Sequence, residues 1–149
     1  VKSQRKYTTV SMRNSQKMPP DLRRLHGMLG FARRAGKVTI GTDLVCRALA
    51  LSGAKKPCLV LYAGTASEPT KKRIRNKSAF YSVPALEVPM STDELARLLG
   101  KTFSPAAVGI HDEPFAEEII KALGIEPQSL RKGISAVAET GDIHGDKVD

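Results

Sequence analysis

Four residues near position 41 have types and a spacing that can bind an anion at a helix start: Gly41, Thr42, Asp43 and Arg47. The first turn of a helix carries unpaired backbone N–H groups and a partial positive charge, which attract phosphate. Glycine allows a close backbone approach, and an arginine one turn later can bind phosphate through its guanidinium. Thr42 and Asp43 can cap the helix or hydrogen-bond to a ligand. The stretch therefore predicts an anion site, and the alternative is an ordinary capped helix with a surface arginine.

Further cations are expected beside this helix start. Arg33, Arg34 and Lys37 come just before it, and the stretch TKKRIRNKSAFY predicts a helix with five Lys or Arg, Lys72 among them. Such a cluster is typical of a surface that neutralises phosphates. We therefore expect Arg33, Arg34, Lys37 and Lys72 to contact a polyanion.

The charge along the chain supports this expectation. Residues 1–82 carry eighteen Lys or Arg against three Asp or Glu, whereas residues 83–149 carry six against twelve, and the net charge is +9. A basic first part and an acidic second part favour a polyanion partner. A soluble protein that is simply basic remains the alternative.

Apolar periodicity and turn residues predict the elements that hold these side chains. A helix capped by Asp21 should end at Gly36, a short strand should follow, and a second helix should run from about residue 42 to near Gly53. CLVLYAG and AAVGI read as strands covered on both faces, and ALEVPM as a further strand. Three more helix starts are indicated by Ser67, by Ser91 with Glu94, and by Asp112. We therefore predict an α/β fold, a three-layer α/β/α sandwich with a mixed, mostly four-stranded sheet.

The length favours one domain with loose ends. We expect a disordered basic arm over residues 1–17, a domain over residues 18–124 and a flexible tail over residues 125–149. The sequence contains no secretory signal and no apolar run of membrane-spanning length, so we expect a cytoplasmic protein, without membrane contact and monomeric.

The residue patterns of known catalytic and metal sites are missing from the sequence. There is no GxGxxG, GxxxxGK[ST] or GxSxG pattern and no paired histidines, and Cys46 and Cys58 are too far apart for a CxxC pair. We therefore expect no catalytic residues, no metal and no cofactor, and both cysteines as reduced, buried residues.

With this element order, the chain resembles the kink-turn RNA-binding ribosomal protein superfamily of the L-seven-Ae and L-thirty-e type, and most closely its bacterial RNA-binding branch. The resemblance runs from about Leu22 to Leu123, over the stretches LGFARRAGKVTIGTDLVCRAL, CLVLYAGTAS, PTKKRI, VPALEVPMSTDELARLLGK and AAVGIHDEPFAEEI. It implies that RNA is bound at the start of the second helix and by a short loop before the last strand.

The resemblance also assigns positions. The family's Gly-x-Asn-Glu-x-x-Lys stretch falls on Gly41 to Arg47, so Asp43 stands for the asparagine, Leu44 for the glutamate and Arg47 for the lysine. An ionised aspartate only accepts hydrogen bonds, and leucine neither donates nor accepts them, so kink-turn recognition should be altered. The loop falls on Lys101, Thr102 and Phe103, where Phe103 can stack on a base.

The leading hypothesis is a non-catalytic protein that binds structured RNA, ribosomal RNA among the candidates. A protein-interaction adaptor on the same fold is the alternative, and a substrate-recognition subunit for an RNA-modifying enzyme is a third. The predicted RNA contacts are Arg33, Arg34, Lys37, Gly41, Thr42, Asp43, Leu44, Arg47, Lys72, Lys101, Thr102 and Phe103.

Overall fold

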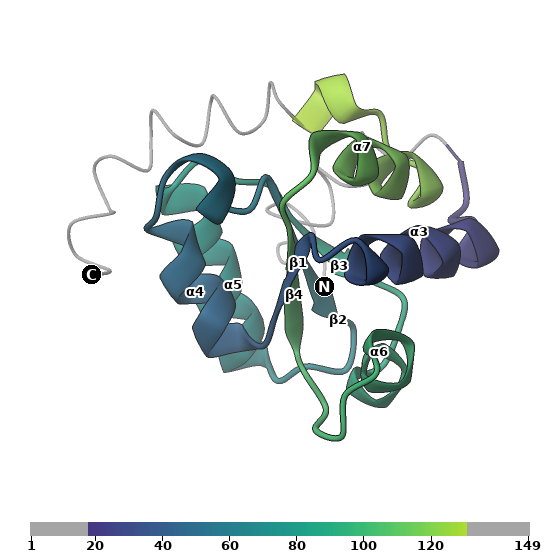
Figure 1. Ribbon diagram of the computed structural model, residues 1–149, viewed down its shortest axis with the longest axis horizontal. Helices are drawn as coiled ribbons and strands as arrows, with labels where there is room; N and C mark the ends of the chain where they lie inside the picture. Colours follow the sequence, from purple (N-terminus) through teal and green to yellow (C-terminus); the bar gives the residue numbers. More distant parts are fainter. Residues whose placement is uncertain (1–17, 131–149) are drawn as a thin grey trace, which may run out of the picture.

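A computed structural model describes residues 18–130 of the chain (Figure 1). The predicted arm over residues 1–17 and the predicted tail beyond residue 130 lie outside this range. The elements in chain order are α3 (Leu22–Arg34), β1 (Val38–Ile40), α4 (Thr42–Leu49), the 3-10 turn η2 (Gly53–Lys55), β2 (Leu59–Ala63), α5 (Glu68–Phe80), β3 (Ala85–Val88), α6 (Thr92–Leu99), β4 (Ala107–Ile110) and α7 (Glu113–Ala122).

The sheet has four strands in the order β1-β4-β2-β3. Strand β4 runs antiparallel to both of its neighbours, whereas β2 and β3 are parallel, so the sheet is mixed. The two central strands, β2 and β4, are buried along their whole length. Their sequences LVLYA and AVGI contain no charged residue, because helices cover both faces of the sheet.

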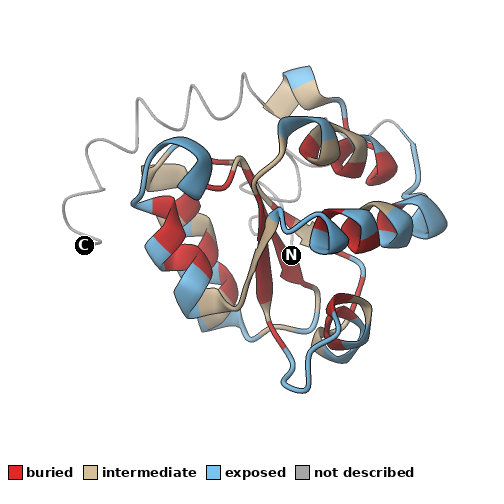
Figure 2. Cartoon of the chain, in the orientation of Figure 1, coloured by how far each residue is buried: buried red, intermediate tan, exposed pale blue. Residues whose placement is uncertain are grey.

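Helices α4 and α5 cover one face of the sheet, and α3, α6 and α7 cover the other (Figure 1). Two apolar clusters fill the spaces between the layers. The larger contains Leu25, Leu61 and Ile119, and the smaller lies under α4 and α5 with Val45 and Ile74. The helices turn their buried residues toward the sheet and their exposed residues outward (Figure 2). The predicted three-layer α/β/α sandwich with a mixed four-stranded sheet is confirmed.

The predicted side-chain caps are present at four helix starts. Asp21, Ser67 and Asp112 each accept a hydrogen bond from a first-turn N–H, and Ser91 forms the reciprocal capping box with Glu94. These caps fix where the helices begin, because they satisfy N–H groups that have no partner inside the helix.

Two predicted ends differ from the observed ones. Helix α4 ends at Leu49, short of the predicted end near Gly53, because Gly53 opens a separate 3-10 turn with a positive φ of 64°. At the other end of the fold, Ile125 is buried and Leu130 packs against the larger cluster. Packed residues therefore continue past the predicted domain end at residue 124.

Candidate nucleic-acid interface

Helix α4 starts without a side-chain cap. Its N-cap residue is Gly41, with φ 112° and ψ 143°, a conformation that only glycine adopts readily. The Gly41 N–H donates to the carbonyl of Ala107 at 2.9 Å, which fixes the helix start to the beginning of β4. Thr42 is the first residue inside the helix and does not cap it, which leaves the other role open to it from the sequence, a hydrogen bond to a ligand. The N-cap residue therefore offers no side-chain acceptor to the first-turn N–H groups, which can receive an anion.

The carboxylate of Asp43 is paired across two helices. Its Oδ1 accepts a hydrogen bond from Nη1 of Arg73 on α5, at 2.9 Å. This hydrogen bond raises the pKa of the Arg73 guanidinium, which stays charged at every physiological pH. Both side chains are largely exposed, at 49% for Arg73 and 73% for Asp43. The helix start therefore carries a cation that the sequence had not assigned to it.

The loop before β4 is held at both ends. Gly100 adopts the left-handed conformation that ends α6, and the N–H of Lys101 donates to the carbonyl of Ala96 at 2.8 Å. At the other end, the Ser104 hydroxyl donates to Asp93 at 2.7 Å. Between these anchors Lys101, Thr102 and Phe103 are exposed, Phe103 by 51%. The fold thus presents an aromatic ring and an ammonium group on a short, anchored loop.

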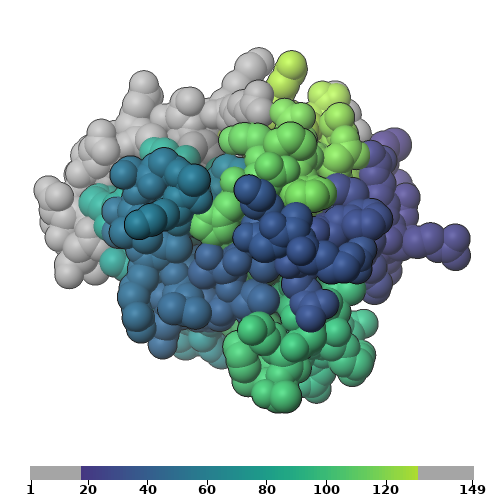
Figure 3. Space-filling model, in the orientation of Figure 1, coloured from purple at the N-terminus to yellow at the C-terminus, as the bar shows by residue number. Residues whose placement is uncertain are grey.

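Backbone hydrogen bonds bring this loop and the α4 start to one end of the sheet. The carbonyl of Ala107 accepts from Gly41, and the adjacent carbonyl of Ala106 accepts from Ala63 at the end of β2. In Figure 3 the blue atoms of the β1–α4 segment lie beside the green atoms near residue 100. This end of the sheet therefore gathers the α4 start, the loop over residues 101–103 and the beginning of α5.

The three cations that precede the helix start in sequence lie in different parts of the fold. A Cβ atom built on Gly100 would lie 2.5 Å from Nη2 of Arg33, so the Arg33 guanidinium rests against the start of the exposed loop. The guanidinium of Arg34 lies 4.8 Å from the ring centroid of Phe31 on α3. The carbonyl of Lys37 accepts from His111, at the opposite end of β4 from Gly41. Arg33 therefore lies against the start of the exposed loop at Gly100, whereas Lys37 is separated from the α4 start by the length of β1.

Packing also separates the five cations of α5. Lys71 is buried, and its ammonium lies 3.4 Å from Glu87 on β3 and 3.8 Å from Glu68. Arg75 is half-buried, with its guanidinium 5.9 Å from the ring centroid of Tyr62. Lys72 and Arg73 are exposed. Lys71 is thus held in a buried ion pair and Arg75 lies against Tyr62, whereas Lys72 and Arg73 face the solvent.

The two helical layers differ in charge. Helices α4 and α5 hold six Lys or Arg against two Asp or Glu, whereas α3, α6 and α7 hold six against five. The excess positive charge of the described helices therefore lies on the α4–α5 side, which is also where Arg47 and Arg73 are. A polyanion that approaches the α4 start is attracted to this side of the molecule.

Other parts of the described chain are less suited to bind RNA. A hollow of about 560 Å³ lies at the far end of the sheet and includes Glu113 and Glu117 in its wall. These carboxylates disfavour RNA there. Within residues 18–130, no three His, Cys, Asp or Glu side chains lie close enough to hold a metal ion. None of the described helices combines the length and apolar composition needed to cross a bilayer.

Comparison with known proteins gives consistent results. Residues 23–120 match the model of the "Ribosomal protein L7Ae/L30e/S12e/Gadd45 family". A curated relative, "RNA-binding protein YlxQ" of Enterococcus faecium, is 38% identical over 92 residues, which cover 61% of this chain and 82% of the relative. The protein of the same name from Bacillus subtilis is 38% identical over 96 residues, which cover 64% and 91%.

Two solved structures are similar. A protein of unknown function from Bacillus halodurans has a TM-score of 0.59 at 25% identity, covering 66% of this chain and 95% of that one. The 15.5kD RNA binding protein of Giardia lamblia has a TM-score of 0.54 at 13% identity, covering 76% and 87%. At that identity the second likeness concerns the fold alone.

Proposed function

Since the chain belongs to the ribosomal protein L7Ae/L30e/S12e/Gadd45 family, we propose that it is a non-catalytic protein that binds structured RNA. One observation carries the proposal. The start of α4, which has no side-chain cap, lies beside the anchored loop over residues 101–103. Arg73 pairs with Asp43 at this helix start, which lies at the edge of the more basic helical layer. The names of the two curated relatives, which describe them as RNA-binding, support it.

The proposed contacts divide by chemistry. The first-turn N–H groups of α4 and the guanidiniums of Arg47 and Arg73 bind phosphate oxygens. Phe103 provides an exposed ring for an unpaired base, and Lys101 beside it provides a charge. The Arg33 guanidinium contacts Gly100 at the start of this loop and so supports it. Phosphate contacts position the RNA, and contacts to the bases provide the specificity.

We further propose that the RNA is ribosomal or a similarly folded RNA, and that a standard kink-turn is bound weakly. Leu44 is 52% exposed at the helix start and has no hydrogen-bonding group to offer to a base edge. The carboxylate of Asp43 accepts from Arg73 and cannot donate. A monomeric, cytoplasmic protein without a cofactor is part of the same proposal.

Salt dependence tests the proposal. Affinity for a labelled hairpin RNA with an internal loop is measured at a series of salt concentrations. Displacement of counterions by Arg47, Arg73 and Lys101 predicts a linear fall of log K with log salt, and three phosphate contacts imply a slope of roughly −2 to −3. Arg47→Ala should reduce the slope by about 1. The control is Arg23→Ala, which removes the same charge from the first turn of α3. A flat response to salt, or equal effects of the two variants, would contradict the proposal.

A protein-interaction adaptor is the second candidate, and the exposed side chains of Leu44 and Phe103 favour it. Two apolar side chains form a small contact area compared with known protein interfaces, and cations surround them. A pull-down from nuclease-treated lysate distinguishes the candidates, because a protein partner would survive removal of RNA.

A further inference from the structure

A surface groove runs between α4 and α5 away from the proposed RNA contact. It has a volume of about 440 Å³ and is lined by Asp43, Cys46, Arg47, Ala50, Arg73, Lys77 and Tyr81. This volume lies within the range of about 300–1,000 Å³ that ligand sites occupy. One end of the groove is the Asp43–Arg73 pair at the start of α4, so the groove continues directly from the proposed contact.

The lining follows from helix periodicity. Asp43 and Arg47 are four residues apart on α4, and Arg73, Lys77 and Tyr81 are spaced by four along α5. Residues four apart lie on one face of a helix, so each helix presents a single row to the groove. The two rows meet where Asp43 bonds to Arg73. The groove is therefore formed by the packing of two helices, and on the α5 side it extends from Arg73 to Tyr81.

The groove is positively charged. Arg47, Arg73 and Lys77 contribute three cations, and the carboxylate of Asp43 is already engaged by Arg73. At the far end, the ammonium of Lys56, which lines the neighbouring hollow, lies 5.9 Å from the ring centroid of Tyr81. The spacing of cations along one line suits a chain of phosphates better than a single anion.

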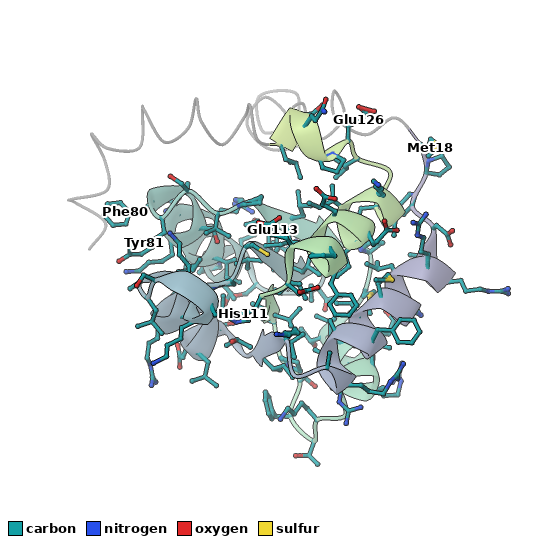
Figure 4. All side chains as sticks on the ribbon, turned by 45° about the horizontal axis from the view of Figure 1, so that its top comes forward. Met18, Phe80, Tyr81, His111, Glu113 and Glu126 are labelled. Carbon is teal, nitrogen blue, oxygen red and sulfur yellow. The ribbon has the colours of Figure 1, made fainter. Side chains whose placement is uncertain are left out.

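The width of the groove selects the kind of RNA. Packed helices have axes about 8–10 Å apart, which is less than the diameter of an RNA double helix. A double helix therefore cannot enter between α4 and α5, but a single strand can follow the groove. Figure 4 shows Tyr81 beside Phe80 at the end of α5, and the groove ends at Tyr81.

From these observations we propose that the groove between α4 and α5 binds a single-stranded RNA segment that continues from the structured RNA held at the start of α4. The proposal rests on the proposed function, since the structured RNA must be bound first. Arg47 and Arg73 are shared by both contacts, whereas Lys77, Ala50 and Tyr81 belong to the groove alone.

The test uses the full chain and three labelled RNAs: a hairpin with an internal loop, and the same hairpin with an unpaired oligouridine tail at its 5′ end or at its 3′ end. At the end of the hairpin from which a strand can enter the groove, a tail should increase affinity about five- to tenfold, as expected for a few backbone and stacking contacts. The gain should disappear in Ala50→Glu, which adds a carboxylate to the groove, and should shrink in Lys77→Gln.

The matched control is Ala35→Glu, because Ala35 and Ala50 are both exposed C-cap residues with nearly the same backbone angles. This control should keep the gain from the tail. In addition, 4-thiouridine in the tail should crosslink to peptides of α4 or α5 that contain Lys77 or Ala50. Unchanged melting temperatures show that the variants remain folded.

The outcomes separate the two proposals. If none of the three RNAs binds, the proposed function fails, and the groove proposal fails with it. If the hairpin binds but the tail gives no gain at either end, or if Ala50→Glu keeps the gain, the groove proposal alone is overturned. Crosslinks confined to α3, α6 or α7 would overturn it as well.

Discussion

The carboxylate of Asp43 at the start of α4 accepts a hydrogen bond from the Arg73 guanidinium on α5, at 2.9 Å, across thirty positions of sequence. The sequence shows only that Asp43 is an acceptor, and the structure adds that Arg73 pairs with it. Pairing offsets the negative charge at the helix start and holds a guanidinium beside it. For a pair this exposed, the contribution to folding stability is small, about 0.2–1 kcal/mol, so its main effect should be on binding.

Arg73→Ala should weaken binding of the hairpin RNA about tenfold or more, because it removes a phosphate contact and leaves the Asp43 carboxylate unpaired. Asp43→Asn in the Arg73→Ala background should recover part of this loss, whereas Asp43→Asn alone should change affinity less than about threefold. Fluorescence anisotropy on the four proteins gives the coupling between the two positions. Additive effects would show that the pair has no role in binding.

The double substitution Asp43→Asn with Leu44→Glu should increase affinity for a kink-turn RNA. It restores an amide that can donate and a carboxylate that can accept from guanine amino groups, and each specific base contact is worth about 1–3 kcal/mol. Because Leu44 is half-exposed, the new side chain should not disturb the core. Titration against a kink-turn duplex and a plain duplex of equal length measures the effect, and the gain should be confined to the kink-turn. Tight, selective binding by the unaltered chain would refute this explanation.

Gly41→Ala should destabilise the fold by about 1–3 kcal/mol, because a φ of 112° is strained for any residue with a Cβ atom. Gly27→Ala is the matched control. Gly27 is exposed within α3, a Cβ there meets no atom within 4 Å, and alanine favours the helix, so stability should rise by about 0.5–1 kcal/mol. Urea unfolding of the two variants should thus give changes of opposite sign. Equal changes would mean that backbone conformation does not decide the residue at position 41.

Stability should fall at alkaline pH, partly through Cys58. Burial raises the pKa of the Cys58 thiol from its ordinary value of 9.0 to about 11. The folded state holds this proton more tightly than the unfolded state does, so the contribution is full below about pH 9 and is lost as pH rises toward 11. Under reducing conditions, the free energy of unfolding should fall less between pH 8 and pH 10 in Cys58→Ala than in the unaltered chain, as measured by urea unfolding. An identical fall in both proteins would contradict the assignment.

The helix starts and strands could be predicted from the sequence because their signals are local. Asp21, Ser67 and the Ser91–Glu94 box act within one helical turn, and CLVLYAG and AAVGI show their burial through composition alone. The position of Gly41 before a helix, and the departures at Asp43 and Leu44 from the family's pattern, could also be predicted from spacing. The missing cap was not predicted, since Thr42 is a good capping residue and only the backbone angles make Gly41 the N-cap.

The sequence by itself thus determined the fold class and the family, and it predicted the end of the sheet where RNA is proposed to bind. Tertiary structure alone decided which cations are available there. Arg73 reaches Asp43, Arg33 reaches Gly100, and Lys71 is buried against Glu87, whereas Lys37 lies at the far end of β1. The physical reason is that periodicity specifies which face of a helix is apolar, but the availability of a charged side chain depends on the neighbouring element that packs beside it.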